Sequence, residues 1–184
     1  METDILFGME KKIIYLLGRS CSGKSTISKK IKQQLPGIYN VSYDTMKWQL
    51  AGYSRDKDRA LIKSIVKDLF ELICSKSIPV LYVSWFRDEK EFLEHKNIES
   101  KYGYKSISVE LTAPEKVLLS RFRERVNDVK KTSMDRISVT DENIFLKNLH
   151  SGEWFTPAII KSFDTSVLSP DAIAEEIVRL FTSL

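Results

Sequence analysis

One short segment constrains the fold of this chain more than any other. Residues 18–25 read GRSCSGKS and match the pattern G-x-x-x-x-G-K-[ST] at every position. Glycines allow the tight turn that brings successive backbone N–H groups to face an anion. A short apolar run, KIIYLL at residues 12–17, precedes the segment, and a helical pattern follows it. This strand–loop–helix context predicts a phosphate-binding loop at the N-terminal end of a helix.

Each position of this loop has an expected role in binding ATP and Mg²⁺. The residues expected to cradle the phosphates are Gly18, Arg19, Ser20, Cys21, Ser22, Gly23, Lys24, Ser25 and Thr26. Lys24 is expected to face solvent and reach the β- and γ-phosphates, and the Ser25 hydroxyl to bind Mg²⁺. We interpret Cys21 as a small loop filler; a reactive thiol of low pKa is the alternative.

Short apolar runs alternate with helical patterns along the rest of the chain. The expected strands are residues 12–17, 38–43, 78–84, 104–111 and 158–163. The expected helices are 24–35, 56–75, 88–101, one that opens at Pro114, 140–149, and one that opens at Pro170. The apolar stripe expected for the helix over 56–75 is Leu61, Ile65, Leu69 and Leu72. This order predicts a three-layer α/β P-loop fold, with a five-stranded parallel sheet and a small lid.

Composition is that of an ordinary globular protein, with 42% apolar and 29% charged residues. We expect one domain over residues 9–184, with residues 1–8 as a short leader and Met9 as an alternative start. Two cysteines do not make a disulfide framework, and we find neither a signal-peptide pattern nor a membrane-spanning run. A cytoplasmic location is therefore expected.

The net charge of +4 is concentrated in one segment. Residues 116–136 hold seven Lys or Arg and three acidic residues, so the rest of the chain is close to neutral. Such a basic cluster favours a phosphate-rich partner, although a solvated helix face is an equally good interpretation. The polar part of this segment, residues 127–136, is expected to form a mobile flap.

Asp44 follows the second expected strand, at the edge where parallel sheets bind ligands. A carboxylate there can accept the proton of an attacking hydroxyl. The alternative is that Asp44 only caps a helix beginning at Thr45. His95 and His150 lack metal-ligand spacing, so we expect neither a zinc site nor a catalytic histidine. The sequence also lacks an Asn/Thr-Lys-x-Asp motif, which disfavours a guanine-specific GTPase.

The segments KKIIYLLGRSCSGKST, residues 11–26, and PGIYNVSYDTMKW, residues 36–48, resemble the small P-loop kinases. Among these, the chain is most similar to the kinase domain of phage-type polynucleotide kinases. The similarity runs loosely from Lys11 to about Leu149 and recurs more weakly in YGYKSISVELTAPEKVLLSRFRER, residues 102–125.

This resemblance implies roles for several residues. Asp44 takes the place of the general base, and Lys47 that of a basic residue, usually Arg, which helps to hold the acceptor phosphate. Because Lys cannot form the two parallel hydrogen bonds that Arg makes to a phosphate, its binding of the acceptor is expected to differ from that of Arg. An arginine on the helix before the lid would contact the ATP phosphates or stack on adenine. The candidates for that arginine are Arg121, Arg123 and Arg125.

Two further segments bear on the acceptor and on adenine. The polynucleotide kinases carry an acidic residue after the third strand, whereas this chain has SWFRD at residues 84–88, so the acid is displaced to Asp88 or absent. Trp85 is interpreted either as a stacking platform for an acceptor base or as a core residue. Thr165 and Ser166 are weak candidates for a contact with adenine; a turn before Pro170 is the alternative.

The sequence therefore predicts ATP- and Mg²⁺-dependent phosphoryl transfer to a hydroxyl. The favoured acceptor is a 5′-hydroxyl of a polynucleotide or oligonucleotide. A small-molecule acceptor, such as a sugar, nucleoside or antibiotic, is the second hypothesis. The third is a regulatory module that binds a nucleoside triphosphate, against which Asp44 argues because such a module needs no base.

Overall fold

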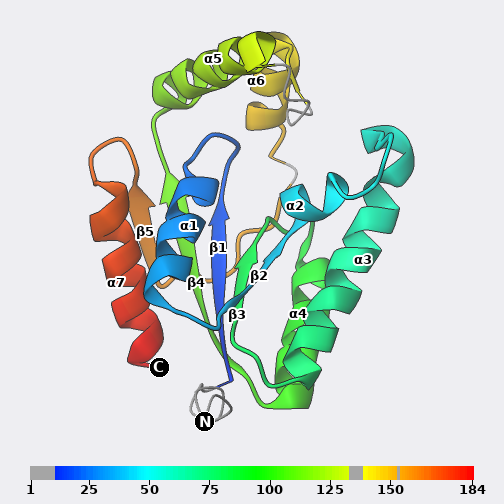
Figure 1. Ribbon diagram of the computed structural model, residues 1–184, viewed down its shortest axis with the longest axis vertical. Coiled ribbons are helices and arrows are strands. Elements are labelled where there is room, and N and C mark those ends of the chain that lie inside the picture. The colour runs from blue at the N-terminus through cyan, green and yellow to red at the C-terminus, as the bar shows by residue number, and fades with distance from the viewer. Residues whose placement is uncertain (1–10, 133–138, 153) are drawn as a thin grey trace.

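Five parallel strands form the central layer of the computed structural model, which describes residues 11–132, 139–152 and 154–184 (Figure 1). The order across the sheet is β2-β3-β1-β4-β5. The strands are β1 (Lys12–Gly18), β2 (Tyr39–Ser42), β3 (Val80–Val83), β4 (Lys105–Thr112) and β5 (Lys161–Asp164). The predicted fold class, a three-layer α/β structure with a five-stranded parallel sheet, is confirmed.

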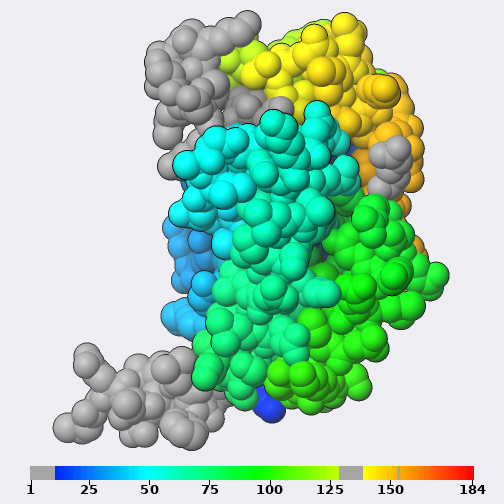
Figure 2. Space-filling model, turned by 90° about the vertical axis from the view of Figure 1, so that its right-hand side faces the viewer, coloured from blue at the N-terminus to red at the C-terminus, as the bar shows by residue number. Residues whose placement is uncertain are grey.

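Helices cover both faces of this sheet. On one face α1 (Lys24–Gln34) packs beside α7 (Pro170–Thr182). On the other face α3 (Arg55–Ser75) packs beside α4 (Glu89–Tyr102), and the space-filling view looks directly onto this pair (Figure 2). The short helix α2 (Tyr43–Lys47) follows β2 at the carboxyl edge of the sheet.

The central strand β1 is buried on both sides, which explains its unbroken apolar run. Ile13 and Tyr15 pack in the core formed with α3 and α4. Ile14 and Leu16 pack in the core formed with α1 and α7. Because both faces are fixed by packing, the strand delivers the loop after Gly18 to a defined place at the carboxyl edge.

A small lid lies above that edge, made of α5 (Glu115–Thr132) and α6 (Glu142–His150) (Figure 1). The rings of Phe122 and Phe145 stack with their centroids 4.3 Å apart. Cys21 belongs to the same buried cluster, so the lid is packed directly onto the phosphate-binding loop.

Several expected boundaries need correction. The last strand begins at Lys161, three residues later than predicted. The expected flap over residues 127–136 is helical as far as Thr132, where α5 ends, and residues 133–138 lie outside the described residues. The expected leader, residues 1–8, also lies outside them.

The expected stripe of α3 is wrong for three of its four residues, whereas Leu69 is half-buried and packs against the core. The structure buries Ile62, Val66, Phe70, Ile73 and Cys74. Leu61 and Leu72 are 51% and 53% exposed, and Ile65 is 37% exposed. The helix carries two apolar series one residue apart, and only the contacts with the sheet decide which of them is buried. Among the described helices, none combines the length and the apolar composition that crossing a membrane requires.

Candidate active site

The phosphate-binding loop requires glycine where it leaves β1. Gly18 has φ 143°, and a Cβ added there would lie 2.5 Å from the carbonyl oxygen of Leu111 and 2.7 Å from Ser22 Oγ. Gly23, with φ 94°, precedes the first turn of α1, and its carbonyl accepts from the amides of Thr26 and Ile27. The predicted strand–loop–helix context is therefore present, and the loop meets the positive end of α1.

Lys24 lies across this loop and is half-buried rather than solvent-facing as predicted. Its Nζ donates to the carbonyl oxygens of Gly18, at 2.6 Å, and Arg19, at 2.8 Å. Removal from water lowers the pKa of Lys24 to about 8, although the carboxylate of Asp44 opposes the shift. The ammonium is thus held within the loop, close to where phosphates would be bound.

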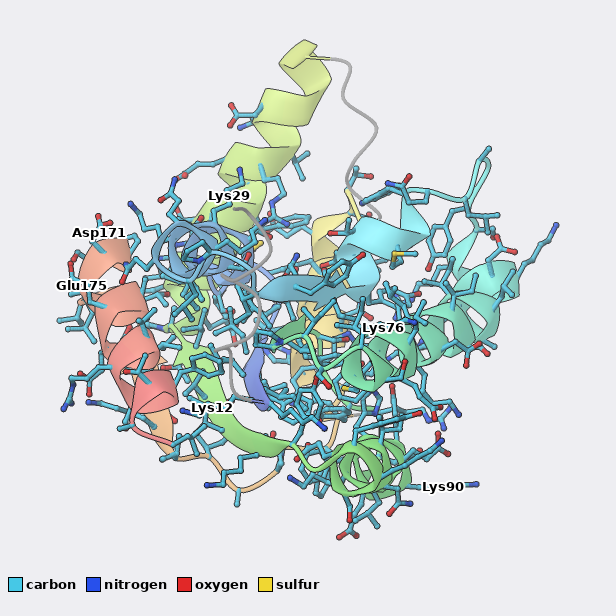
Figure 3. All side chains as sticks on the ribbon, turned by 60° about the horizontal axis from the view of Figure 1, so that its bottom comes forward. Lys12, Lys29, Lys76, Lys90, Asp171 and Glu175 are labelled. Atoms are coloured by element: carbon cyan, nitrogen blue, oxygen red, sulfur yellow. The ribbon has the colours of Figure 1, made fainter. Side chains whose placement is uncertain are left out.

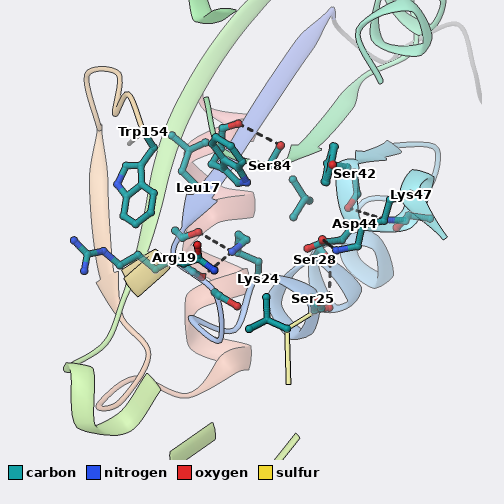
Figure 4. A pocket seen from close by; sticks show the side chains of 18 of the residues that line it. Leu17, Arg19, Lys24, Ser25, Ser28, Ser42, Asp44, Lys47, Ser84 and Trp154 are labelled. Carbon is teal, nitrogen blue, oxygen red and sulfur yellow. Dashed lines mark hydrogen bonds and ion pairs between the residues drawn. The ribbon is translucent and has the colours of Figure 1, made fainter. Parts of the chain in front are cut away.

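A cleft of about 1330 Å³ opens beside the loop (Figure 4). Its walls come from β1, α1, the end of β2, α2, the start of α3 and the lid. Sites for one drug-sized ligand usually measure roughly 300–1,000 Å³. The cleft therefore has room for a nucleotide together with a second ligand.

Asp44 stands in this cleft opposite Lys24 (Figure 4). Its side chain is 68% exposed and accepts a hydrogen bond of 2.5 Å from Lys47 Nζ. Partial removal from water raises the pKa of Asp44, but the charges of Lys47, Lys24 and Arg125 outweigh this and hold it below its usual value. The carboxylate is therefore ionised at neutral pH and accessible.

The capping interpretation of Asp44 is wrong, because Ser42 is the N-cap of α2 and its Oγ accepts from the amide of Thr45 at 3.4 Å. Lys47 is buried and lies 5.0 Å from the centroid of the Trp48 ring. It contacts Asp44 directly, so it orients the carboxylate. Its role toward an acceptor phosphate stays a prediction.

The wall beyond Asp44 is aromatic and cationic. Trp85 is half-buried and lines the cleft, while the neighbouring Phe86 takes the core position, so the core interpretation of Trp85 is wrong. The guanidinium of Arg59 lies 5.0 Å from the centroid of the Trp85 ring and also faces the cleft. Asp88 caps α4, accepting from the amide of Glu91 at 2.8 Å, and does not line the cleft.

The three candidate arginines of α5 have different environments. Arg121 Nη1 donates to Thr165 Oγ1 at 2.8 Å and to the carbonyl oxygen of Cys21 at 3.3 Å, and its Nη2 donates to the carbonyl oxygen of Thr165 at 2.7 Å. Arg125 lines the cleft one turn further along. Arg123 pairs with Glu142 of the lid and does not line the cleft, so its candidacy is not supported.

A smaller pocket of about 240 Å³ lies on the other side of the loop. Thr26, Arg121, Thr165 and Leu168 are among its lining residues. The Thr165 hydroxyl donates to the carbonyl oxygen of Thr112, so its polar atoms hold the fold while its methyl group faces Gly23. Ser166 is absent from the lining, because its amide and hydroxyl both bind Asp164 Oδ1 in a turn.

Neither histidine lies in a metal-binding group. His95 is buried among aromatic rings, which lowers its pKa, and its Nδ1 contacts the carbonyl oxygen of Glu91. His150 pairs with Glu115. In the described part of the chain no three His, Cys, Asp or Glu side chains gather as metal ligands. Mg²⁺ usually keeps several waters and binds substrate phosphates, so the exposed Ser25 hydroxyl in the cleft fits it as a single protein ligand.

Sequence reasoning missed several residues of the cleft. Arg59 and Trp154 come from segments without a motif; Trp154 lies 5.1 Å from the guanidinium of Arg19. Glu110, on β4, also lines the cleft. The available signal for Glu110 was a carboxylate between the apolar residues Val109 and Leu111, near the carboxyl end of a strand. Lys29 and Asn40 gave no signal, because only the tertiary fold brings them together.

Comparison with known proteins agrees with this architecture. A family model described as an AAA domain, AAA_33, matches residues 13–143. No curated protein matches the chain in sequence.

Solved structures match almost the whole chain, though at low sequence identity. A provisionally assigned kinase from Chloroflexus aurantiacus is 17% identical, with a TM-score of 0.74, and the match covers 93% of this chain and 98% of that one. An APS kinase from Mycobacterium tuberculosis, in complex with AMPPNP and APS, is 16% identical with a TM-score of 0.64, covering 93% and 97%. A shikimate kinase from Acinetobacter baumannii, in complex with shikimate, is 16% identical with a TM-score of 0.58, covering 96% of both chains. The fold is thus that of P-loop kinases, and a particular resemblance to polynucleotide kinases is not shown.

Proposed function

This chain belongs to the AAA domain family and has a kinase-like P-loop fold, and from that premise we propose that it transfers the γ-phosphate of ATP to a hydroxyl acceptor. One observation carries the proposal. An accessible, ionised carboxylate, Asp44, faces the loop lysine, Lys24, within one cleft. A protein that only binds or hydrolyses a nucleotide as a switch needs no such acceptor-side base, which disfavours the regulatory-module hypothesis.

The donor would lie along the loop. Backbone amides of residues 18–25 and the Lys24 ammonium would hold the β- and γ-phosphates, and Arg125 would add positive charge from the lid. Mg²⁺, held by the Ser25 hydroxyl, would neutralise charge on the phosphates when bound. The smaller pocket beside Thr26 and Leu168 is suited to the adenine ring, with Arg121 fixed at its edge.

The reaction follows from this placement. The acceptor oxygen attacks the γ-phosphorus, and a new P–O bond forms as the bond to the β–γ bridging oxygen breaks. The hydroxyl proton passes to the Asp44 carboxylate, and ADP leaves with the electron pair of the broken bond. Lys47 keeps the carboxylate aimed at the acceptor through its hydrogen bond of 2.5 Å.

We favour a 5′-hydroxyl of an oligonucleotide or polynucleotide as the acceptor. The acceptor wall offers aromatic rings, Trp48 and Trp85, on which a base can stack, and guanidinium groups, Arg55 and Arg59, for phosphate. A small-molecule acceptor is the second candidate, because kinases of APS and of shikimate share the fold.

Transfer of labelled γ-phosphate tests both candidates. Oligonucleotides, nucleosides and sugars with free hydroxyls should be compared across a salt series. The affinity for an oligonucleotide acceptor should fall steeply as salt rises, by about 0.7 log units per log unit of salt concentration for each phosphate contacted. A Michaelis constant for the acceptor that does not change with salt concentration would indicate an uncharged small molecule. No labelling of oligonucleotides even at low salt, with normal ATP binding, would reject the nucleic-acid acceptor.

A further inference from the structure

The cleft extends away from the acceptor wall into an arm between α1 and β2. The helix α1 packs on β1 and β3, whereas β2 is the edge strand of the sheet and lies beyond it. The face of β2 that looks toward α1 carries polar side chains. The residues of this α1–β2 arm are Ser28, Lys29, Lys32, Asn40 and Ser42.

Two lysines of the arm stand apart from the other charges of α1. Lys29 and Lys32 are exposed, line the cleft, and have no acidic partner among the residues that the structure describes. Their neighbour Lys30 instead pairs with Asp171 of α7 at 2.6 Å, and Figure 3 shows Asp171 away from Lys29. The side of α1 that faces α7 is thus neutralised, while the side that faces the cleft keeps its positive charge.

Asn40 adds a second sign that the arm receives a polar ligand. Its Oδ1 is buried and has no hydrogen-bond partner within the described chain. A buried polar atom without a partner is energetically unfavourable, so such atoms usually meet a ligand or water. The NH₂ group of Asn40 is not among these buried atoms, and Asn40 lines the cleft, so this group can donate to an anion in the arm.

We infer that the α1–β2 arm binds one phosphate ester of the acceptor, remote from the hydroxyl that reacts; this inference rests on the proposed kinase function. Residues three apart on a helix are separated by about 4.5 Å along its axis, so Lys29 and Lys32 can contact the same phosphate. Asn40 contributes a hydrogen bond from the opposite side of the arm. The phosphate belongs either to an oligonucleotide backbone or to a small phosphorylated molecule.

Matched acceptors and matched variants test this subsite. Thymidine, thymidine 3′-phosphate and 5′-hydroxyl oligothymidylates carry the same reacting hydroxyl and differ in their phosphates. Lys29→Ala and Lys32→Ala, alone and combined, should be compared with Lys30→Ala, which removes the same charge from the far side of α1.

The combined variant should raise the Michaelis constant for phosphate-bearing acceptors by about tenfold or more, since it removes two charge-assisted contacts to the phosphate. It should leave kcat, the Michaelis constant for ATP and the rate with thymidine unchanged. Lys30→Ala should change none of these quantities, nor the Michaelis constant for phosphate-bearing acceptors. If the wild-type Michaelis constant is already lower for thymidine 3′-phosphate than for thymidine, a small phosphorylated acceptor is sufficient to occupy the arm. If it is lower only for oligothymidylates, the arm binds a backbone phosphate. Equal losses for thymidine and its phosphates, or no loss, would overturn the subsite.

A binding measurement separates failure of the subsite from failure of the proposed function. If wild-type protein labels none of these acceptors, the kinase assignment fails for this substrate class. Fluorescence anisotropy of a labelled oligothymidylate then tests the arm without catalysis. The combined variant should lower the slope of log affinity against log salt by about 0.7, and Lys30→Ala should not. An unchanged slope would contradict the binding of a phosphate by the α1–β2 arm.

Discussion

The two sides of the cleft are built differently. On the nucleotide side two basic side chains are held by the protein itself: Lys24 bonds to carbonyls of its own loop, and Arg121 joins that loop to Thr165. On the acceptor side, polar and charged groups such as Arg59, Lys29 and Asn40 face the cleft, and none has a hydrogen bond or ion pair to another described residue. The difference indicates a donor site organised before ligands arrive and an acceptor site completed by its ligand.

Asp44 lies at the boundary between the two sides. Its electrostatic partners come from both: Lys24 and Arg125 from the nucleotide side and Lys47 from α2. Its carboxylate is nonetheless 68% exposed, so an acceptor can approach it. In the proposed reaction, Asp44 is therefore the residue through which the nucleotide side acts on the acceptor.

On the nucleotide side, the largest effect should follow from Lys24→Ala. In the proposed reaction the substitution removes the ammonium that faces the transferring phosphoryl group, and loss of one such preorganised donor typically costs about 10²–10³ in turnover. Circular dichroism should show an unchanged fold, and the surface variant Lys30→Ala should retain full activity. Turnover close to that of the wild type in Lys24→Ala would mean that the loop does not hold the donor.

A smaller effect is expected from Arg121→Ala. The variant loses three hydrogen bonds that join the loop, α5 and the turn after β5. We expect a loss of about 2–3 kcal/mol in the free energy of unfolding, measured by urea denaturation, together with weaker ATP binding. Arg123→Ala is the matched control on the same helix, and it should change neither quantity because its pair with Glu142 lies on the surface. Equal behaviour of the two variants would refute the idea of an organised nucleotide side.

The mildest test uses pH alone. The pKa of Lys24 is lowered to about 8 without nucleotide, so the ammonium is fully present below that pH and is lost as the pH rises above it. Affinity for an ATP analogue should be constant from pH 6 to 7.5 and then fall, approaching tenfold per pH unit. In Lys24→Arg the fall should vanish, because arginine stays charged throughout this range. A flat profile for wild-type protein would show that Lys24 does not pair with the phosphates.

The sequence was sufficient to predict the nucleotide side and the fold class. The loop is a local motif whose glycines and lysine act over eight consecutive residues, and the alternation of strands and helices is equally local. The position of Asp44 in the cleft was also predicted, because it lies just after a strand at the carboxyl edge of the sheet, while its catalytic role stays a prediction.

The acceptor side was harder to predict for a physical reason. Arg59, Trp154 and Asn40 lie far apart in sequence and come together only through packing. The choice between the two apolar series of α3 likewise depends on contacts with the sheet. Arg123 could not be distinguished from Arg121 and Arg125 until the position of Glu142 was known.

Asp44→Asn provides the most direct test of the central claim, that an ionised carboxylate activates the acceptor. The variant preserves shape and removes the basic oxygen. Transfer of labelled γ-phosphate should be measured under single-turnover conditions, with the affinity for an ATP analogue measured in parallel. We predict a rate about 10²- to 10⁴-fold lower than wild type, with nucleotide affinity changed by less than about twofold. An unchanged transfer rate, with or without a lower melting temperature, would contradict a catalytic role for Asp44.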